Sequence, residues 1–317
     1  MKKGAHGTLV PPDDEREAID ILMSIEPRIK DIAHIDLEYI ANMDSTNMTP
    51  HEWDIIIDAI ERNYAYYDGF VITHGTDTMA YTASALSIAI QNLGKPIILT
   101  GSQIPAYALY TDARRNLINA IRVATLDISG VYIVFDERII MGARATKASE
   151  SKLDAFQTVN NRDAGEIRIE IELSSDVPRR HRGKIRVIKG FESDVFVTSL
   201  IPGQDVTDLE FLLDNERIKG IIIKAFGTGN IPYNFESFFR KAREKRVPIV
   251  ITSQCLHGVT RMQCYDVGRR ALELGAIEGY DQSLEVLVVK LMWALRHYPY
   301  EEIKKVINTN FVGELKV

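Results

Sequence analysis

The chain has 317 residues, of which 45% are hydrophobic and 26% are charged. This length exceeds one ordinary hydrophobic core and predicts two domains of unequal size, and the composition excludes an intrinsically disordered protein. The formal net charge is −6, with 38 basic residues against 44 acidic ones spread along the chain, so we expect no nucleic-acid partner.

Short apolar, β-branched runs alternate with longer segments of helical period through most of the sequence. Such runs are typical of strands that helices cover on both faces, so we predict an α/β fold. A larger N-terminal domain would hold a parallel or mixed sheet flanked by helices, and a smaller C-terminal domain a parallel α/β sheet. In chain order, the expected strands are 71–73, 97–100, 131–135, 195–198, 221–223 and 249–252.

The helical segments between these runs carry their own signals. Thr49 and Glu52 form a capping box, with Pro50 at the first helical position and an apolar face that starts at Trp53. A further helix should follow residues 74–78 directly. Other helices are expected at about 111–125, 234–245 and 283–297.

The stretch from about 162 to 193 breaks the alternation, because it is charged and contains Pro178, Gly183 and Gly190. It is the expected linker between an N-terminal domain, residues 1–188, and a C-terminal domain, residues 194–317. Its dense basic part, residues 179–186, is better explained as a solvated surface loop than as a polyanion site.

Cysteine usage and hydropathy narrow the class of protein further. Cys255 and Cys264 have eight residues between them and lie in no CxxC or His-rich frame, so we expect neither a disulfide framework nor a zinc site. No window approaches the roughly 18 to 20 uninterrupted apolar residues of a membrane span. The first residues lack the apolar core of a signal peptide. We therefore expect a cytoplasmic enzyme with no membrane partner.

Four polar clusters lie at the ends of predicted elements. In an open α/β sheet, ligands bind beyond the carboxyl ends of the strands, and His74-Gly75-Thr76-Asp77-Thr78 follows the strand 71–73. Thr and Asp are also ordinary N-cap residues, which is the simpler explanation for this cluster alone. Similar clusters occupy 43–48, 99–105 and 142–147. Together, their hydroxyls, one carboxylate and one lysine suffice for nucleophilic acyl transfer without a metal or cofactor.

These clusters resemble the L-asparaginase family, in particular its cytoplasmic type I branch. The similarity extends over nearly the whole chain, and the HGTDT block is far more specific than a glycine pattern. The matching segments are 43–50, 67–70 leading into 74–81, 99–105, 146–148 with 154–156, 227–230 and 313–315.

The resemblance implies a reaction and three catalytic residues. Family members hydrolyse the side-chain amide of asparagine to aspartate and ammonia through an acyl-threonine intermediate. In them, the residues that match Thr76, Asp77 and Lys147 form a proton-handling triad. A neutral threonine is a poor nucleophile, so the lysine amine must take its proton.

The resemblance also implies how a small zwitterion, L-asparagine, is recognised. Asp77 would accept the α-ammonium beside Thr76, and hydroxyls and backbone N–H groups of Asp44, Ser45 and Thr46 would bind the α-carboxylate. The backbone carbonyl of Ser102 would accept a hydrogen bond from the scissile amide. Relatives are homodimers or homotetramers, so a homo-oligomer is expected as well.

One departure from the family concerns the primary nucleophile. Family members begin with a strand that ends in Thr-Gly-Gly-Thr-Ile, and the second threonine of that motif attacks the substrate. This chain has no such segment: Met1 aligns just after it, and Thr8 follows a glycine without a preceding strand pattern.

We therefore expect the natural protein to begin roughly 15 residues upstream, and this chain by itself to show little or no asparaginase activity. The coding DNA read in frame tests this expectation. A reading frame without Gly-Gly-Thr upstream would contradict it.

Two other functions stay open. One is the ammonia-producing component of an archaeal tRNA-dependent amidotransferase, which shares the Thr-Asp-Lys set but carries an extra N-terminal domain. The other is a non-catalytic protein that binds an amino acid, which would fit the absent nucleophile. Dependence on glutamyl-tRNA would select the first, and aspartate binding without turnover, in a chain shown to start truly at Met1, would select the second.

Overall fold

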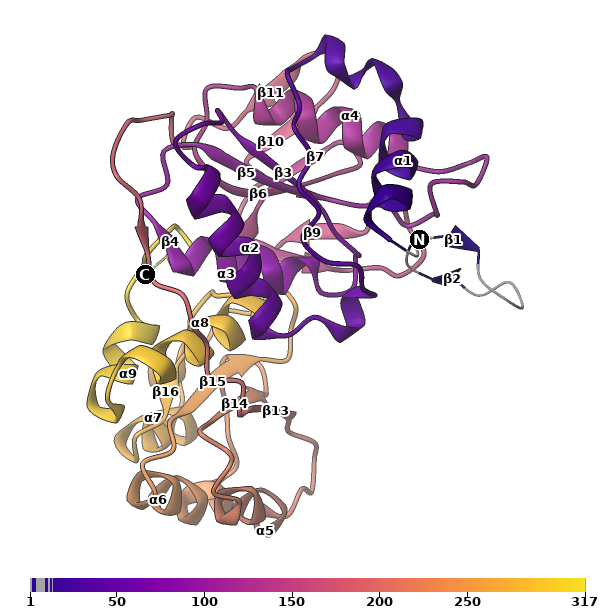
Figure 1. Cartoon of the computed structure of the whole chain (residues 1–317). Helices are drawn as coiled ribbons and strands as arrows, with labels where there is room; N and C mark the ends of the chain where they lie inside the picture. The colour runs from indigo at the N-terminus through magenta and orange to yellow at the C-terminus, as the bar shows by residue number, and fades with distance from the viewer. Residues whose placement is uncertain (1, 4–8, 11, 13, 317) are drawn as a thin grey trace. The chain divides into compact units, whose positions relative to one another are not determined.

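The chain separates into two units, each with its own sheet (Figure 1). They are Met1–Lys189 and Gly190–Val317 in this computed structural model, which describes residues 2–3, 9–10, 12 and 14–316. Thr8 lies outside the described residues. The first sheet is mixed and the second is parallel, so the predicted fold class is confirmed.

A six-stranded sheet forms the centre of the first unit, in the order β11-β10-β7-β6-β5-β3. β3, β5 and β6 pair in parallel, whereas β7, β10 and β11 join the sheet antiparallel. Thr73 of β3 lies opposite Thr100 of β5, so these two strands end at the same edge. The strands are β3 (Phe70–Thr73), β5 (Pro96–Thr100), β6 (Gly130–Phe135), β7 (Arg138–Met141), β10 (Gly165–Ile167) and β11 (Ile171–Leu173).

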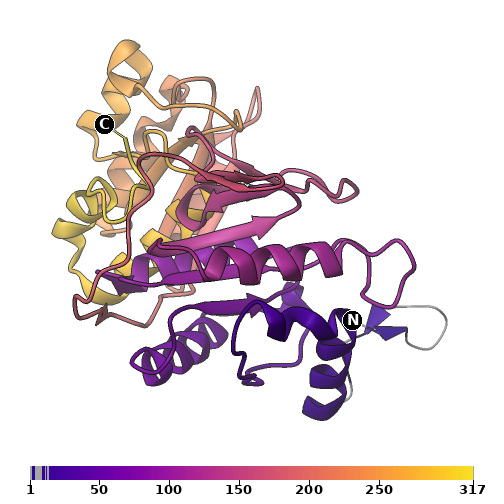
Figure 2. The ribbon, with the colours of Figure 1, turned by 90° about the horizontal axis from the view of Figure 1, so that it is seen from above.

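Helices cover both faces of this sheet (Figure 1; seen from above in Figure 2). α4 (Ala113–Ala124) packs on β5 and β6 and shares a buried cluster with Ile98. Because side chains alternate across a strand, Val131 of β6 faces the other side of the sheet from this cluster. On that side α3 (Met79–Ala89) packs on β5 and β6. α3 is buried around its circumference, since α2 packs on its outer side. The core of this unit therefore lies in two layers, one on each face of the sheet.

α2 (Pro50–Asn63) begins as the sequence predicts. The Thr49 side chain caps its first turn, and the Glu52 side chain reaches back to the Thr49 backbone N–H at 2.8 Å. Trp53 and Ile57 lie on its buried face. The other expected helices are confirmed at α4, at α6 (Glu236–Glu244) and at α8 (Leu284–His297).

Short elements complete the first unit. The expected linker, 162–193, carries the β10–β11 hairpin and β12, because its charged residues alternate with buried ones: Glu166 is exposed between buried Gly165 and Ile167. The remaining elements are β1 (Lys2–Lys3) with β2 (Leu9–Val10), α1 (Glu15–Ile25), η2 (Pro27–Asp31), η3 (Ser45–Asn47), β4 (Ile90–Gln91) with β12 (Arg186–Val187), η4 (Gly142–Arg144), and β8 (Ala145–Lys147) with β9 (Phe156–Thr158).

The second unit is built on four parallel strands in the order β13-β14-β15-β16. The expectation that every strand is covered on both faces is wrong for β13, where Phe196 is 38% and Val197 37% exposed, because β13 is the outermost strand of this sheet. The elements are β13 (Val195–Ser199), α5 (Val206–Glu210), η5 (Phe211–Asp214), β14 (Gly220–Ala225), η6 (Tyr233–Phe235), α6, β15 (Ile249–Ser253), η7 (Met262–Cys264), α7 (Asp266–Glu273), β16 (Ile277–Glu278), α8 and α9 (Tyr300–Ile307).

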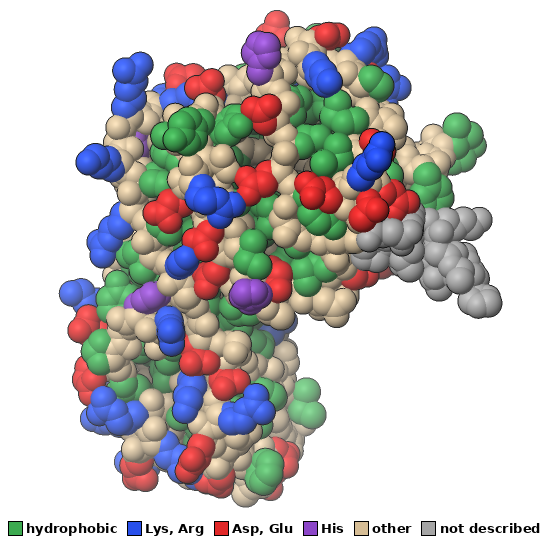
Figure 3. Space-filling model, viewed as in Figure 1, with side chains coloured by type: hydrophobic (Ala, Val, Ile, Leu, Met, Phe, Trp, Pro, Cys, Tyr) green, Lys and Arg blue, Asp and Glu red, His purple; other side chains and the backbone are tan. Residues whose placement is uncertain are grey.

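Surface features add little that singles out a partner. The helices of the described residues include none that is both long and apolar enough to cross a bilayer. Cys255 and Cys264 are free thiols on the surface. Positive and negative side chains intermingle on the face drawn in Figure 3. Within the described ranges, His, Cys, Asp and Glu side chains form no group of three that could hold a metal ion.

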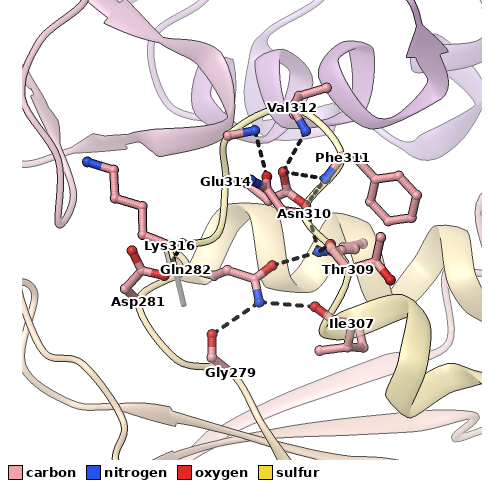
Figure 4. A network of polar contacts seen from close by, with 12 residues as sticks. Gly279, Asp281, Gln282, Ile307, Thr309, Asn310, Phe311, Val312, Glu314 and Lys316 are labelled. Carbon is pink, nitrogen blue, oxygen red and sulfur yellow. Dashed lines mark hydrogen bonds and ion pairs between the residues drawn. The ribbon is translucent and has the colours of Figure 1, made fainter. Parts of the chain in front are cut away.

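A buried polar network holds the segment 309–316, and Figure 4 shows the contacts of Glu314 with the backbone of Phe311 and Val312. A buried ion pair fastens this segment to α8. Lys290 Nζ lies 2.6 Å from Glu314 Oε1, and both side chains are 0% exposed. The Glu314 carboxylate also accepts the backbone N–H groups of Phe311 and Val312, and Lys290 donates to Gln282 Oε1 at 3.0 Å. Because a buried charge is costly without its partner, this network should be sensitive to single substitutions.

We expect Glu314→Gln to lower the free energy of unfolding of the second unit by about 3–5 kcal/mol, because it removes the Glu314 charge that faces the buried Lys290 ammonium. The double variant Lys290→Met/Glu314→Gln should recover part of that loss. Urea unfolding followed by Trp293 fluorescence, in a Trp53→Phe background, measures it.

Glu301→Gln is the matched control, because it removes a carboxylate from an exposed ion pair with Arg246 in the same unit. It should leave the unfolding midpoint near that of the parent. If the double variant were less stable than Glu314→Gln, the loss of stability could not be due to the Lys290 charge that remains after Glu314 is neutralised.

Candidate active site

The ends of β3 and β5 bring two of the four polar clusters together. The His74 backbone N–H donates to the Thr100 carbonyl at 2.8 Å, one residue beyond the paired strands. The segment 74–78 and the loop that starts at Gly101 therefore leave the sheet side by side. Ser102 lies in that loop, two residues beyond Thr100.

Lys147, at the end of β8, contacts both other predicted catalytic residues. Its Nζ donates to Thr76 Oγ1 at 2.9 Å and to Asp77 Oδ1 at 2.5 Å. The Lys147 side chain is 19% exposed and that of Asp77 54%. The structure thus places an amine between a hydroxyl and a carboxylate, and the contact with Asp77 is a charge-assisted hydrogen bond. Their roles in a reaction stay a prediction.

The simpler explanation of this cluster as helix capping does not account for its side chains. Thr78 occupies the N-cap position of α3, but neither it nor Asp77 caps the helix in the usual way: the Thr78 side chain makes no cap hydrogen bond and donates instead to the Ser45 carbonyl at 2.8 Å. The Asp77 carboxylate is directed to Lys147. Both side chains therefore bind other segments.

The segment 44–46 reaches the same place through Ser45. A Cβ added at Gly75 would lie 2.5 Å from Ser45 Oγ, so only glycine allows this approach. Asp44 caps η3, and its carboxylate accepts the Thr46 N–H and hydroxyl, both at 2.9 Å. These hydrogen bonds hold the pKa of Asp44 below its ordinary value.

His74 is a residue that the sequence analysis named only as part of a cluster. Its Nδ1 lies 2.7 Å from the Gly75 carbonyl, so this nitrogen carries the proton, and Nε2 accepts from Thr82 Oγ1 at 2.9 Å. Trp53 Nε1 in turn donates to Thr82 Oγ1 at 3.1 Å. Burial is the main cause that lowers the pKa of His74 from its ordinary value of 6.5, so a neutral ring holds the Gly75 carbonyl.

Asp112 and Asn116 of the α4 region were missed altogether. Both are buried, and both bind the backbone of the loop that holds Ser102. An aspartate directly before a helix has the same sequence signal as an ordinary N-cap, so the pattern could not distinguish them.

All four clusters thus meet at one edge of the first unit. They supply hydroxyls, one lysine amine, two carboxylates and backbone carbonyls, several of which are joined by hydrogen bonds. This set can move a proton from a hydroxyl to an amine and bind the charged ends of a small zwitterion, which are the requirements of acyl transfer from an amino-acid amide.

Two family models match the chain. The model described as asparaginase, N-terminal, matches residues 1–179, and the glutaminase/asparaginase C-terminal domain matches residues 194–307.

Individual relatives agree with these matches. The chain is 38% identical over 303 residues to an L-asparaginase of Thermococcus kodakarensis, which is 94% of this chain and 91% of the relative. It is 36% identical to a component of the glutamyl-tRNA(Gln) amidotransferase of the same organism, over 91% of this chain and 68% of the relative. The solved structure of the thermostable L-asparaginase from Thermococcus kodakarensis superposes with a TM-score of 0.90 and 36% identity, covering 98% of this chain and 97% of that one.

We expect His74→Gln to lower the stability of the first unit by about 1–3 kcal/mol near neutral pH, because the hydrogen bonds of the partly buried ring to Gly75 and Thr82 are lost. The loss should shrink as the pH falls. The unfolded chain takes up a proton on this histidine near its ordinary pKa of 6.5, whereas the folded chain does not, because burial lowers the pKa. The contribution of His74 is therefore present above about pH 6.5 and is lost below it.

Urea unfolding followed by the fluorescence of Trp53, in a Trp293→Phe background, measures the difference between the two proteins. A difference that stays constant from about pH 7.5 to pH 5 would contradict a neutral, buried His74.

Proposed function

Since this chain belongs to the asparaginase family, we propose that L-asparagine is hydrolysed to L-aspartate and ammonia at the site of Thr76, Asp77 and Lys147, together with an attacking threonine of the Thr-Gly-Gly-Thr-Ile motif, which these 317 residues do not contain. The observation that carries this proposal is the position of Lys147 Nζ, within hydrogen-bond distance of both the Thr76 hydroxyl and the Asp77 carboxylate. The three residues come from segments about seventy positions apart, so their meeting is a property of the fold.

In the proposed reaction, Thr76 and Lys147 shuttle a proton for an acyl-threonine intermediate. The neutral Lys147 amine accepts the proton of the attacking threonine through the Thr76 hydroxyl. Asp77 stabilises the Lys147 ammonium that forms. The attacking oxygen is that of the second threonine of the family's Thr-Gly-Gly-Thr-Ile motif, which these 317 residues do not contain. It bonds to the side-chain carbonyl carbon of asparagine, and Lys147 returns the proton to the nitrogen that leaves as ammonia. Water then hydrolyses the ester by the same proton path.

The substrate contacts that we propose rest on the observation that the four polar clusters lie together at one edge of the first unit. Asp77 accepts the α-ammonium, the segment Asp44, Ser45 and Thr46 binds the α-carboxylate, and the Ser102 carbonyl accepts the amide N–H. The Thr46 N–H and hydroxyl already bind the Asp44 carboxylate. A ligand carboxylate therefore competes with Asp44 for these donors. The Ser45 side chain, in contrast, faces Gly75 of the cluster 74–78.

A second candidate is the ammonia-producing component of a tRNA-dependent amidotransferase. The match to the glutamyl-tRNA(Gln) amidotransferase component, at 36% identity over 91% of this chain, favours it. The chain spans 68% of that relative, against 91% of the L-asparaginase. Ammonia release that requires glutamyl-tRNA and a partner protein would select this candidate.

In a chain extended at its N-terminus by a Thr-Gly-Gly-Thr-Ile segment, we expect Lys147→Met and Thr76→Val each to reduce ammonia release from L-asparagine by about 10²–10⁴-fold, because either change interrupts the proton path. Lys152→Met is the matched control, since this lysine lies exposed five positions further along the chain and should retain activity. Turnover like that of the parent in both Lys147→Met and Thr76→Val would overturn the proposed roles.

A chain whose coding DNA is shown to start at Met1, and that binds L-aspartate but releases no ammonia, would instead select a non-catalytic binding protein. Mass spectrometry of the chain quenched during turnover locates the acylated residue. An acyl group on any residue other than a threonine would contradict the proposed intermediate.

A further inference from the structure

Asp112 occupies the N-cap position of α4 but does not cap it. Its carboxylate makes no hydrogen bond to the helix backbone, and the Ala113 N–H donates instead to Thr111 Oγ1 at 3.1 Å. Asp112 is 4% exposed. A buried carboxylate needs hydrogen-bond donors, so its partners show what it is for.

Those partners are two consecutive backbone N–H groups of the loop after β5. Gln103 N–H donates to Oδ2 and Ile104 N–H to Oδ1, both at 3.0 Å. Asn116, one turn along α4, donates to Asp112 Oδ2 at 3.0 Å and to the Gly101 carbonyl at 2.9 Å. The helix thus holds this loop by its backbone on both sides of Ser102.

The hydrogen bond from the Gln103 N–H to Asp112 also fixes the direction of the Ser102 carbonyl. The two groups belong to the same peptide unit, and the described part of the chain has no cis peptide bond. In a trans peptide the C=O and the N–H point to opposite sides. Because the Gln103 N–H points to Asp112, the Ser102 carbonyl points away from Asp112 and α4.

The loop that contains Ser102 is also bound by the segment that follows Lys147. The Ser102 carbonyl takes no part in these contacts. Gln103 Nε2 donates to the Glu150 carbonyl at 3.0 Å and to the Lys152 carbonyl at 3.3 Å, in the segment that follows Lys147. Among the residues that the structure describes, no donor binds the Ser102 carbonyl oxygen. It is an oriented acceptor that has no partner among the described residues.

We propose that Asp112 is a positioning residue that aims the Ser102 carbonyl at the side-chain amide of the substrate and thereby selects an amide over a carboxylate. This inference rests on the proposed function of the site. An amide offers N–H groups to the carbonyl oxygen, whereas the carboxylate of L-aspartate offers only acceptors and is repelled. Asp112 therefore favours binding of the substrate over binding of the product.

The test compares the affinities of L-asparagine and L-aspartate by calorimetry. The whole chain carries Lys147→Met, which prevents turnover during the measurement. Adding Asp112→Asn should weaken L-asparagine binding by about 3- to 10-fold, the equivalent of one neutral hydrogen bond, and leave L-aspartate binding unchanged or tighter. The Asp112→Asn side chain has one acceptor oxygen for the N–H groups of Gln103 and Ile104. The loop therefore loses one of these two hydrogen bonds with little change in side-chain volume.

Asn119→Ala is the matched control. Asn119 is also buried on α4 and also binds a backbone carbonyl, that of Asp136 at 3.0 Å, but it does not bind the Ser102 loop. It should change both affinities equally or not at all. If Asp112→Asn does not fold, Asp112→Glu supplies the same comparison, because it keeps the charge and moves the carboxylate by one methylene.

The outcomes separate this inference from the proposed function. A parent that binds neither amino acid overturns the proposed function itself. A parent that binds both, with an affinity ratio that Asp112→Asn or Asp112→Glu leaves unchanged, overturns only the role of Asp112. A ratio that Asn119→Ala changes as much as Asp112→Asn also overturns that role, since any damage to α4 would then suffice.

Discussion

The parallel pairing of β3 with β5 is the constraint on which the rest of this site depends. Because Thr73 lies opposite Thr100, both strands end at one edge, and their continuations leave the sheet together. The hydrogen bond from His74 N–H to the Thr100 carbonyl continues this register beyond the strands. A shift of one residue would turn every side chain of β3 to the other face and separate the two loops.

Two of the polar groups around this edge bind neighbouring segments rather than the helix ends at which they lie. Thr78 and Asp112 both stand where an N-cap belongs, yet one donates to Ser45 and the other accepts from the Ser102 loop. A helix without its usual cap loses about 0.5–2 kcal/mol. What this arrangement provides is a set of donors and acceptors fixed before any ligand arrives, which is the condition for electrostatic catalysis and for specific binding.

The sequence carries the frame of the fold more clearly than the arrangement of the site. β5, β6, β14 and β15 were predictable because they are buried runs with β-branched residues, and α2 because of its capping box. β10 and β11 were not, because one face of that hairpin is charged and exposed. The clusters at strand ends were visible as residue types, but the contact of Lys147 with Thr76 is long-range, and no local pattern encodes it. Asp112 was hidden for a different reason, since its sequence signal is that of an ordinary helix start.

The close approach of Ser45 to Gly75 has a consequence for protein engineering. The two positions share one small volume, so any side chain added at 75 alone forces the Ser45 side chain to shift. A library at 75 therefore needs a smaller residue at 45, which also removes a hydroxyl from the site. Over evolutionary time the same geometry should make these two positions covary, although thirty residues separate them in the sequence.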